Sequence, residues 1–364
     1  MEYMKLGDIV NIRTGKLNAN VADEKGSYPF FTCSKKISSI SSYSYDTEAV
    51  LVAGNGDLNV KYYKGKFDAY QRTYIITDNS SNQLYMPFLY FYMSAYVAQL
   101  RNQAIGGVIK YIKLQNLTEA EIRLPSIEQQ KEIVKFLQII QGVINDKKNE
   151  MSKLDELIKA RFVEMFGDPI NNSKNWKLIN IKKCCVDILG GGTPSKSHPE
   201  FFTGSVPWVT PKDMKENVIT DSKDHITYEA ISNSSAKLIP SNSVLMVIRS
   251  GILKHTLPVA INKNEVTINQ DMKAFVPTSE ISPIFLENYF IAISPDILSK
   301  VRSVTADNIN FKSFQKRKII LPPISLQNEF ANFVQQVDKS KVAVQKSLDE
   351  TQTLFDSLMQ KYFR

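Results

Sequence analysis

The chain has 364 residues, a formal net charge of +8 and three cysteines. This length exceeds what one ordinary hydrophobic core organises, so we expect more than one globular part. The cysteines (Cys33, Cys184 and Cys185) cannot make an even disulfide framework and lack zinc-ligand spacing, which predicts a reducing, cytoplasmic location. We expect no signal peptide, and no apolar run reaches the ~20 residues of a membrane span.

Short strands and turns are predicted in residues 4–80. Apolar or alternating runs cover residues 6–12, 49–53, 61–63 and 70–77, and Gly54-Asn55-Gly56-Asp57 reads as a turn between two of them. Pro87 then opens a predicted helix over residues 88–101 that is rich in tyrosine and phenylalanine. Because these aromatic residues recur all around the helix, we interpret them as core rather than as a platform for stacking bases.

A long segment, residues 124–166, recurs without a gap at residues 321–363, at an offset of 321 − 124 = 197 positions. Leu124-Pro125 meets Leu321-Pro322, Gln130 meets Gln327, and Phe166 meets Phe363. A repeat of this length indicates a repeated architecture.

Alternating steps of four and three residues through each copy pass mainly through apolar side chains, which is typical of a coiled-coil seam. The predicted pairing residues are Ile133, Leu137, Ile140, Ile144, Met151, Leu154 and Ile158 in the first copy, and Phe330, Val334, Val337, Val344, Leu348, Phe355 and Leu358 in the second. The nine-residue linker 167–175 spans only about 30 Å when extended, whereas each helix is roughly 60 Å long. Antiparallel pairing is therefore favoured.

The second globular part repeats the first loosely. Pro207-Trp208-Val209-Thr210 corresponds to Pro29-Phe30-Phe31-Thr32, and Pro283 opens a predicted helix as Pro87 does. The polar loop residues differ almost throughout, which suits a protein that recognises two different things. The predicted fold is α+β: two globular α/β domains, 1–124 and 169–321, separated by two long helices, 125–168 and 322–364, that pair as an antiparallel coiled coil with an approximate two-fold axis.

Catalytic and metal-binding motifs are missing. His198, His225 and His255 are isolated from one another and from the cysteines, which disfavours a zinc site. The sequence has no phosphate-binding G-x-x-x-x-G-K-[ST] loop and no Asp-Pro-Pro-Tyr box of the kind that amino-methyltransferases use. We therefore predict neither catalytic nor metal-binding residues in this chain.

This order of parts resembles the specificity (S) subunit of type I restriction-modification systems, in which two target recognition domains alternate with two conserved helical regions. The resemblance covers essentially the whole chain. It is carried by the helix entries Leu124-Pro125-Ser126-Ile127-Glu128-Gln129-Gln130 and Leu321-Pro322-Pro323-Ile324-Ser325-Leu326-Gln327, and by Gly191-Gly192-Thr193-Pro194-Ser195, which looks like a family turn.

The resemblance implies a non-catalytic subunit that binds a bipartite site in double-stranded DNA, with one recognition domain on each half-site. It implies two modification (methyltransferase) subunits and, in the full complex, two restriction and translocation subunits as partners. S-adenosylmethionine, ATP and Mg²⁺ would belong to those partners. Two alternatives remain open: a coiled-coil scaffold with two protein-binding heads, and a specificity protein with hidden nuclease activity.

DNA recognition needs cations for the phosphates, and amides or arginine for the base edges. The candidates in the first domain are Lys35, Lys36, Asn55, Lys61, Gln71, Arg72, Lys110 and Lys113. Those in the second are Gly191, Gly192, Thr193, Lys196, Lys212, Arg249, Ser250, Lys254, Asn269, Gln270, Asn308 and Lys312. The strongest are Gln71-Arg72, Arg249-Ser250 and Asn269-Gln270, because predicted strand ends hold them on a rigid scaffold.

Overall fold

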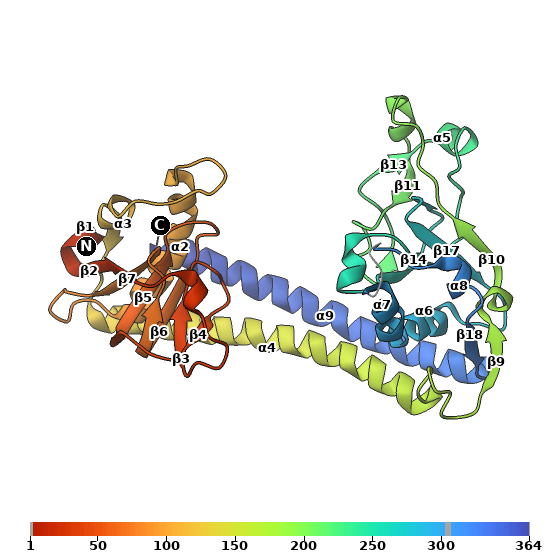
Figure 1. Ribbon diagram of the computed structural model, residues 1–364, viewed down its shortest axis with the longest axis horizontal. Helices are drawn as coiled ribbons and strands as arrows, with labels where there is room; N and C mark the ends of the chain where they lie inside the picture. The colour runs from red at the N-terminus through yellow and green to blue at the C-terminus, as the bar shows by residue number, and fades with distance from the viewer. Residues whose placement is uncertain (1–2, 303–306, 364) are drawn as a thin grey trace. The chain divides into compact units, whose positions relative to one another are not determined.

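The computed structural model describes residues 3–302 and 307–363, and these fall into two compact units (Figure 1). Unit 1 comprises Met1–Asn149 with Gln345–Arg364, and unit 2 comprises Glu150–Val344. Each unit contains one globular domain together with part of each long helix, α4 (Ile127–Phe166) and α9 (Ile324–Phe363). The domain boundaries proposed from the sequence stay a prediction.

A six-stranded sheet forms the globular part of unit 1, in the order β2-β7-β5-β6-β3-β4. Helix α2 (Met86–Gln103) packs on it, and Val50, Val52 and Ile76 of the sheet share a core with Phe88 and Leu89 of the helix. The strands are β2 (Val10–Thr14), β3 (Tyr28–Phe31), β4 (Ser38–Ile40), β5 (Tyr45–Ala53), β6 (Val60–Ala69) and β7 (Thr73–Asp78).

Short elements complete unit 1. Strand β1 (Tyr3–Lys5) pairs antiparallel with β8 (Glu121–Arg123), and the remaining turns of helix are α1 (Leu6–Ile9), η1 (Ala19–Val21) and α3 (Gln115–Thr118). The predicted strand at residues 6–12 is wrong over its first half. Leu6 and Ile9 are both buried, and a spacing of three residues puts them on one side of a single helical turn.

Unit 2 holds a five-stranded sheet in the order β10-β17-β14-β15-β12 and a three-stranded sheet in the order β13-β11-β16. The strands of these sheets are β10 (Cys185–Gly190), β11 (Val206–Val209), β12 (Val218–Ile219), β13 (His225–Ile226), β14 (Val244–Val247), β15 (Val259–Asn262), β16 (Thr267–Ile268) and β17 (Met272–Pro277). Strand β9 (Lys177–Asn180) pairs separately with β18 (Lys318–Leu321).

The helices of unit 2 surround these sheets. They are η2 (Ile181–Cys184), η3 (Pro199–Phe202), α5 (Tyr228–Ser232), η4 (Gly251–Lys254), α6 (Pro283–Ala292), α7 (Ser294–Arg302) and α8 (Phe311–Phe314). Helix α6 packs on the larger sheet, where Phe285 and Phe290 join Val244 and Phe275 in the core. No helix within the described ranges combines the length and the apolarity needed to cross a membrane.

The two long helices run antiparallel, as predicted, because within each unit the start of one lies against the end of the other. In unit 2, Phe162 and Phe166 near the end of α4 each place a ring 5.5 Å from that of Phe330 near the start of α9. In unit 1, Ile133 of α4 and Phe355 of α9 pack against the same core. All the pairing residues chosen from the sequence are buried or half-buried.

One buried glutamine ties each long helix to the globular part of its own unit. Gln130 accepts a hydrogen bond from the backbone N–H of Tyr85 (2.8 Å) and donates to the carbonyls of Gln83 (2.8 Å) and Pro125 (2.9 Å). Its repeat counterpart Gln327 makes the same three kinds of bond. It accepts from the N–H of Ser282 (2.9 Å) and donates to the carbonyls of Glu280 (3.0 Å) and Pro322 (2.9 Å). Both side chains are 0% exposed.

Candidate nucleic-acid interface

Several strand ends of unit 2 converge on a cleft of about 810 Å³. The cleft lies where β10 and β11 end, where β14 leads into η4, and in the turn between β16 and β17. Trp208 and Phe202 supply an aromatic wall, with ring centroids 5.8 Å apart. Six residues that the sequence predicts to bind DNA line this cleft, namely Thr193, Lys196, Lys212, Ser250, Asn269 and Gln270.

Glycines bring the backbones around the cleft close together. A Cβ added to Gly191 would lie 2.0 Å from the carbonyl oxygen of Asn269, and the N–H of Gly192 donates to the carbonyl of Ile268 (2.9 Å). The carbonyl of Gly192 in turn accepts from the indole N–H of Trp208 (3.0 Å). Gly191 and Gly192 thus hold the β16–β17 turn against the end of β10, and only glycine fits so close an approach.

Arg249 lies beside this cleft, after the end of β14. Its Nε donates to Oδ1 of Asp271 (2.5 Å), which is itself a lining residue. The other carboxylate oxygen of Asp271 accepts from Nδ2 of Asn269 (3.2 Å). The exposed guanidinium is therefore held at Nε by a carboxylate. Asn269, by contrast, is buried and has its amide engaged within the turn.

The remaining candidates of unit 2 lie outside the cleft lining. Lys254 forms an ion pair with Asp307 (3.3 Å), and the backbone of Asn308 forms a bridge with that of Arg249. Lys312 is exposed on α8. Within the cleft itself, Gln270 is exposed, and its side-chain oxygen accepts a hydrogen bond from the hydroxyl of Thr193.

In unit 1, loops around the corresponding strand ends also gather. Lys35 pairs with Asp57 (3.0 Å), the carbonyl of Arg72 accepts from the N–H of Gly54 (2.8 Å), and the N–H of Gly56 donates to the carbonyl of Lys110 (2.9 Å). Asn55 forms a backbone bridge with Tyr111. The structure thus brings Lys35, Asn55, Arg72 and Lys110 into one loop cluster.

A glycine supports this loop cluster as Gly191 supports the cleft. A Cβ on Gly15 would lie 2.1 Å from the carbonyl oxygen of Ala69, so β2 ends directly against the turn that carries Gln71. Gln71 is exposed and donates from Nε2 to Oδ1 of Asn18 (3.0 Å). In both units, therefore, a glycine at the end of a strand marks a close approach between that strand end and a turn that carries candidate residues.

The other unit 1 candidates are placed differently. Lys61 is half-buried, donates to Oδ1 of Asn59 (2.5 Å), and has its pKa lowered by burial. Lys36 is exposed in the loop after β3, and the N–H of Lys113 donates to the side chain of Asn116 (2.7 Å). The acidic partners Asp57 and Asp271 were missed from the sequence. Asp57 follows a turn glycine and Asp271 follows a glutamine, but only the folded chain shows which cationic side chain each carboxylate contacts.

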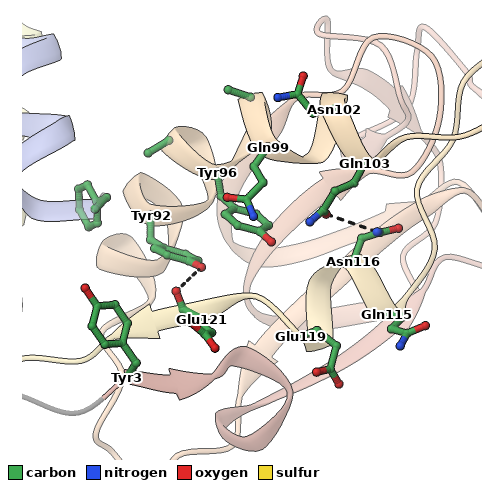
Figure 2. Close-up of a pocket in the computed structure, with 13 residues that line it drawn as sticks. Tyr3, Tyr92, Tyr96, Gln99, Asn102, Gln103, Gln115, Asn116, Glu119 and Glu121 are labelled. Carbon is green, nitrogen blue, oxygen red and sulfur yellow. Dashed lines mark hydrogen bonds between the residues drawn. The ribbon is translucent and has the colours of Figure 1, made fainter.

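A further cleft in unit 1, of about 860 Å³, has a different chemistry (Figure 2). Tyr92, whose hydroxyl donates to the carbonyl of Glu121 (2.9 Å), stacks on Tyr96 there, and Glu119 and Glu121 stand on the opposite wall. Carboxylates repel phosphate, and none of the DNA-binding candidates lines this cleft. It is therefore not part of the candidate interface.

Side chains that bind metal do not gather in the described residues. These residues contain no group of three or more His, Cys, Asp or Glu side chains able to hold a metal ion. His198 pairs with Glu200 (2.8 Å) and His225 with Asp221 (2.8 Å). Burial raises the pKa of the Cys184 and Cys185 thiols to about 12, which keeps them protonated and unreactive at neutral pH.

A family model described as "Type I restriction modification DNA specificity domain" matches residues 1–154 and 173–351. The chain belongs to this type I DNA-specificity family. The type I restriction enzyme EcoDI specificity subunit of Escherichia coli is similar to this chain. The two are 27% identical over 395 residues, which cover 99% of this chain and 87% of that protein. The EcoR124I/EcoR124II specificity subunit of the same organism is 29% identical over 279 residues, covering 72% of this chain and 66% of that protein.

The fold agrees with that membership. The crystal structure of the S subunit of a type I restriction-modification system from M. genitalium matches with a TM-score of 0.61 and 15% identity, covering 100% of this chain and 96% of that one. As a type I specificity subunit, this chain supplies DNA recognition to a restriction-modification enzyme and is not the catalytic subunit. The predicted α+β fold and the predicted family are both confirmed.

Proposed function

We propose that this specificity subunit binds a bipartite site in double-stranded DNA, with the cleft of unit 2 on one half-site and the loop cluster of unit 1 on the other. It holds two modification subunits, joined by two restriction and translocation subunits in the full complex. S-adenosylmethionine, ATP and Mg²⁺ are bound by those partners. The observation that carries the proposal is the gathering of Thr193, Lys196, Lys212, Ser250, Asn269 and Gln270 around one cleft.

The two sites differ in chemistry although their scaffolds correspond. The unit 2 cleft combines amides, hydroxyls and an aromatic wall with Arg249 at its edge. The unit 1 loop cluster presents mainly cations, with Arg72 exposed at its centre. Arginine reads guanine by a bidentate contact in the major groove, whereas lysine mostly neutralises phosphate. Each unit therefore suits a different half-site sequence.

Replacing Arg249 with alanine should relax sequence preference in one half-site only. A lost bidentate base contact costs about 1–3 kcal/mol, or roughly 5- to 150-fold in discrimination at the affected position. Sites selected from random DNA by the assembled enzyme would report the change. Arg72→Ala is the matched variant, and it should relax the other half-site and leave this one intact.

Two outcomes would contradict these roles. A uniform loss of affinity for all sequences would show that Arg249 binds phosphate, and unchanged selection would remove it from the interface. DNA binding without any dependence on salt concentration would favour a scaffold with protein-binding heads instead, because phosphate contacts make affinity fall as salt rises.

An exposed apolar stripe on α4 in unit 1 supports partner binding by the long helices. Phe136, Ile139 and Val143 are 47%, 55% and 40% exposed, and their spacing of three and four residues puts them on one helix face. This face is distinct from the seam formed by Ile133, Leu137 and Ile140. Contiguous apolar side chains exposed on a helix are typical of a protein interface.

Ile139→Glu should weaken binding of the modification subunit by roughly 30-fold or more, since a charge buried at the centre of an apolar interface costs at least about 2 kcal/mol. Co-purification and isothermal titration with the modification subunit measure this. Asn145→Glu, on another exposed face of the same helix, adds the same charge and should bind normally. Equal binding by both variants would place the modification subunit elsewhere.

A further inference from the structure

Unit 2 contains a cleft of about 490 Å³ between α6 and the first half of α9, with Ile158 of α4 in its wall. At its base lies Glu287 of α6, which is only 4% exposed. Among the described residues, none forms a hydrogen bond with Oε1 of Glu287, and that atom is fully buried. A buried polar atom without a partner is costly, and native proteins keep very few of them.

The charged groups around Glu287 do not neutralise it by direct contact. Asp338 and Lys341 approach from α9, and Lys263 from the turn after β15. Lys341 is already engaged, with its Nζ 2.5 Å from Asp155 of α4 and 3.7 Å from Asp338. Burial, reinforced by Asp338, raises the pKa of Glu287 to about 8. Of the charged side chains that line the cleft, Glu287 and Asp338 are acidic and Lys263 is cationic.

The side chains of the walls and rim indicate which kind of group the cleft would bind. Ile158, Ile261 and Val334 supply apolar walls, whereas Asn328, Asn332 and Gln335 form an exposed row of amides along the rim. Lysine and arginine combine an apolar stem with a cationic head, so they match apolar walls above a carboxyl group. DNA is excluded, because its phosphates would meet Glu287 and Asp338.

The matching positions in unit 1 carry two lysines and lack the glutamate. At the repeat offset of 197, Asn328 and Asn332 correspond to Lys131 and Lys135. The same offset relates Ser282 to Tyr85, whose N–H groups bind Gln327 and Gln130, and it places Tyr90 at the position of Glu287. Lys131 and Lys135 are exposed, and Tyr90 packs on Phe91 with ring centroids 5.2 Å apart. A cationic side chain that unit 2 accepts would therefore be repelled in unit 1.

We propose that the unit 2 cleft receives a lysine or arginine side chain of the modification subunit, with its cationic head on Glu287 and its stem between the apolar walls. This inference rests on the proposed function, since it names a contact of the same partner. It makes the two modification subunits inequivalent: the one bound at unit 2 gains an ion pair that the one bound at unit 1 lacks.

The affinity of this contact depends on the protonation of Glu287. A cation pairs with the ionised carboxylate, so below the pKa of Glu287, about 8, its entry expels a proton. Affinity at unit 2 should then rise about 10- to 30-fold between pH 6.5 and pH 8.5 and level off above that. Burial also raises the pKa of Asp338, which faces Glu287 from α9.

The test is calorimetric titration of the full chain with its modification subunit at pH 6.5, 7.5 and 8.5. We expect Glu287→Gln, which keeps the side-chain volume, to lower the affinity of one binding event by about tenfold or more at pH 8.5 and to flatten its dependence on pH. The other binding event should be unchanged. Glu265→Gln removes an exposed carboxylate outside the cleft and should behave as the wild type does at every pH.

The possible results separate failure of this inference from failure of the proposed function. If Glu287→Gln binds the modification subunit with wild-type affinity and pH dependence, the inference is overturned although the proposed function stands. If Glu287→Gln impairs only the restriction subunit, the occupant is wrong and the inference falls. If the wild-type chain does not bind the modification subunit at all, the proposed function fails. Circular dichroism of each variant confirms that the fold is retained.

Discussion

Replacing Gln130 with leucine is expected to destabilise unit 1 by about 3–6 kcal/mol. The substitution removes three part-buried hydrogen bonds and leaves the N–H of Tyr85 and the carbonyls of Gln83 and Pro125 facing an apolar side chain. Each such group costs about 1–2 kcal/mol, the lower part of the range for a fully buried group, because these positions are only partly buried. Gln130→Glu should also destabilise, because its second carboxylate oxygen would face two carbonyl oxygens in place of a donor.

The measurement must resolve one unit from the other, since a chain of two units need not unfold in one step. Hydrogen exchange followed residue by residue does this, and the Tyr85 amide should lose its protection in Gln130→Leu. Gln327→Leu should produce the same loss at Ser282 in unit 2. Gln138→Leu, an exposed position on α4, serves as the control. Protection of Tyr85 that survives in Gln130→Leu would show that the glutamine is dispensable.

The second large effect concerns Glu287 and the stability of the free chain. Its pKa lies near 4.5 when unfolded and is raised to about 8 in the folded state. Below pH 4.5 the carboxyl group of Glu287 is protonated in both the folded and the unfolded state, so the fold is at its most stable with respect to this group. As the pH rises from 4.5 to 8 the unfolded state ionises first, so folding stability falls, by about 3–5 kcal/mol in total at 1.36 kcal/mol per pKa unit.

Glu287→Gln removes this titration. The difference in free energy of unfolding between the variant and the wild type should therefore shift in favour of the variant as the pH rises from 4.5 to 8, and should be constant above pH 8. Denaturant unfolding across this range measures it, and Glu265→Gln should show no such shift. A difference that does not change with pH would mean that the carboxyl group is ionised and solvated in the folded chain.

The long helices were predictable because their evidence is local and repeated. A 3.5-residue apolar period, the prolines at 125 and 322 and the matched Gln130 and Gln327 all lie in the sequence itself. The role of the glutamines was not predictable, since their partners lie about 45 residues away along the chain and only the fold brings them together. The strand predicted at residues 6–12 failed where an apolar run was short enough to fit either structure.

The candidate interface was predictable in part for similar reasons. Gln71, Arg72, Asn269 and Gln270 follow apolar strands, and the structure places them in turns held by close glycines. Glu287 was overlooked, although a lone acidic residue inside the apolar run 284–290 was a usable signal. Burial of that carboxyl group depends on α9, which is distant in sequence, so its unusual pKa followed only from the structure.

Within the described part of the chain, the hydrogen bonds of the two buried glutamines all go to backbone groups. Their partners are amides and carbonyls, and the residues supplying them differ between the copies: Gln83 and Tyr85 in one, Glu280 and Ser282 in the other. The joint therefore places no demand on side-chain identity there. We therefore expect a globular part of unrelated sequence to stay attached to the long helix if its backbone offers one N–H and one carbonyl at these positions.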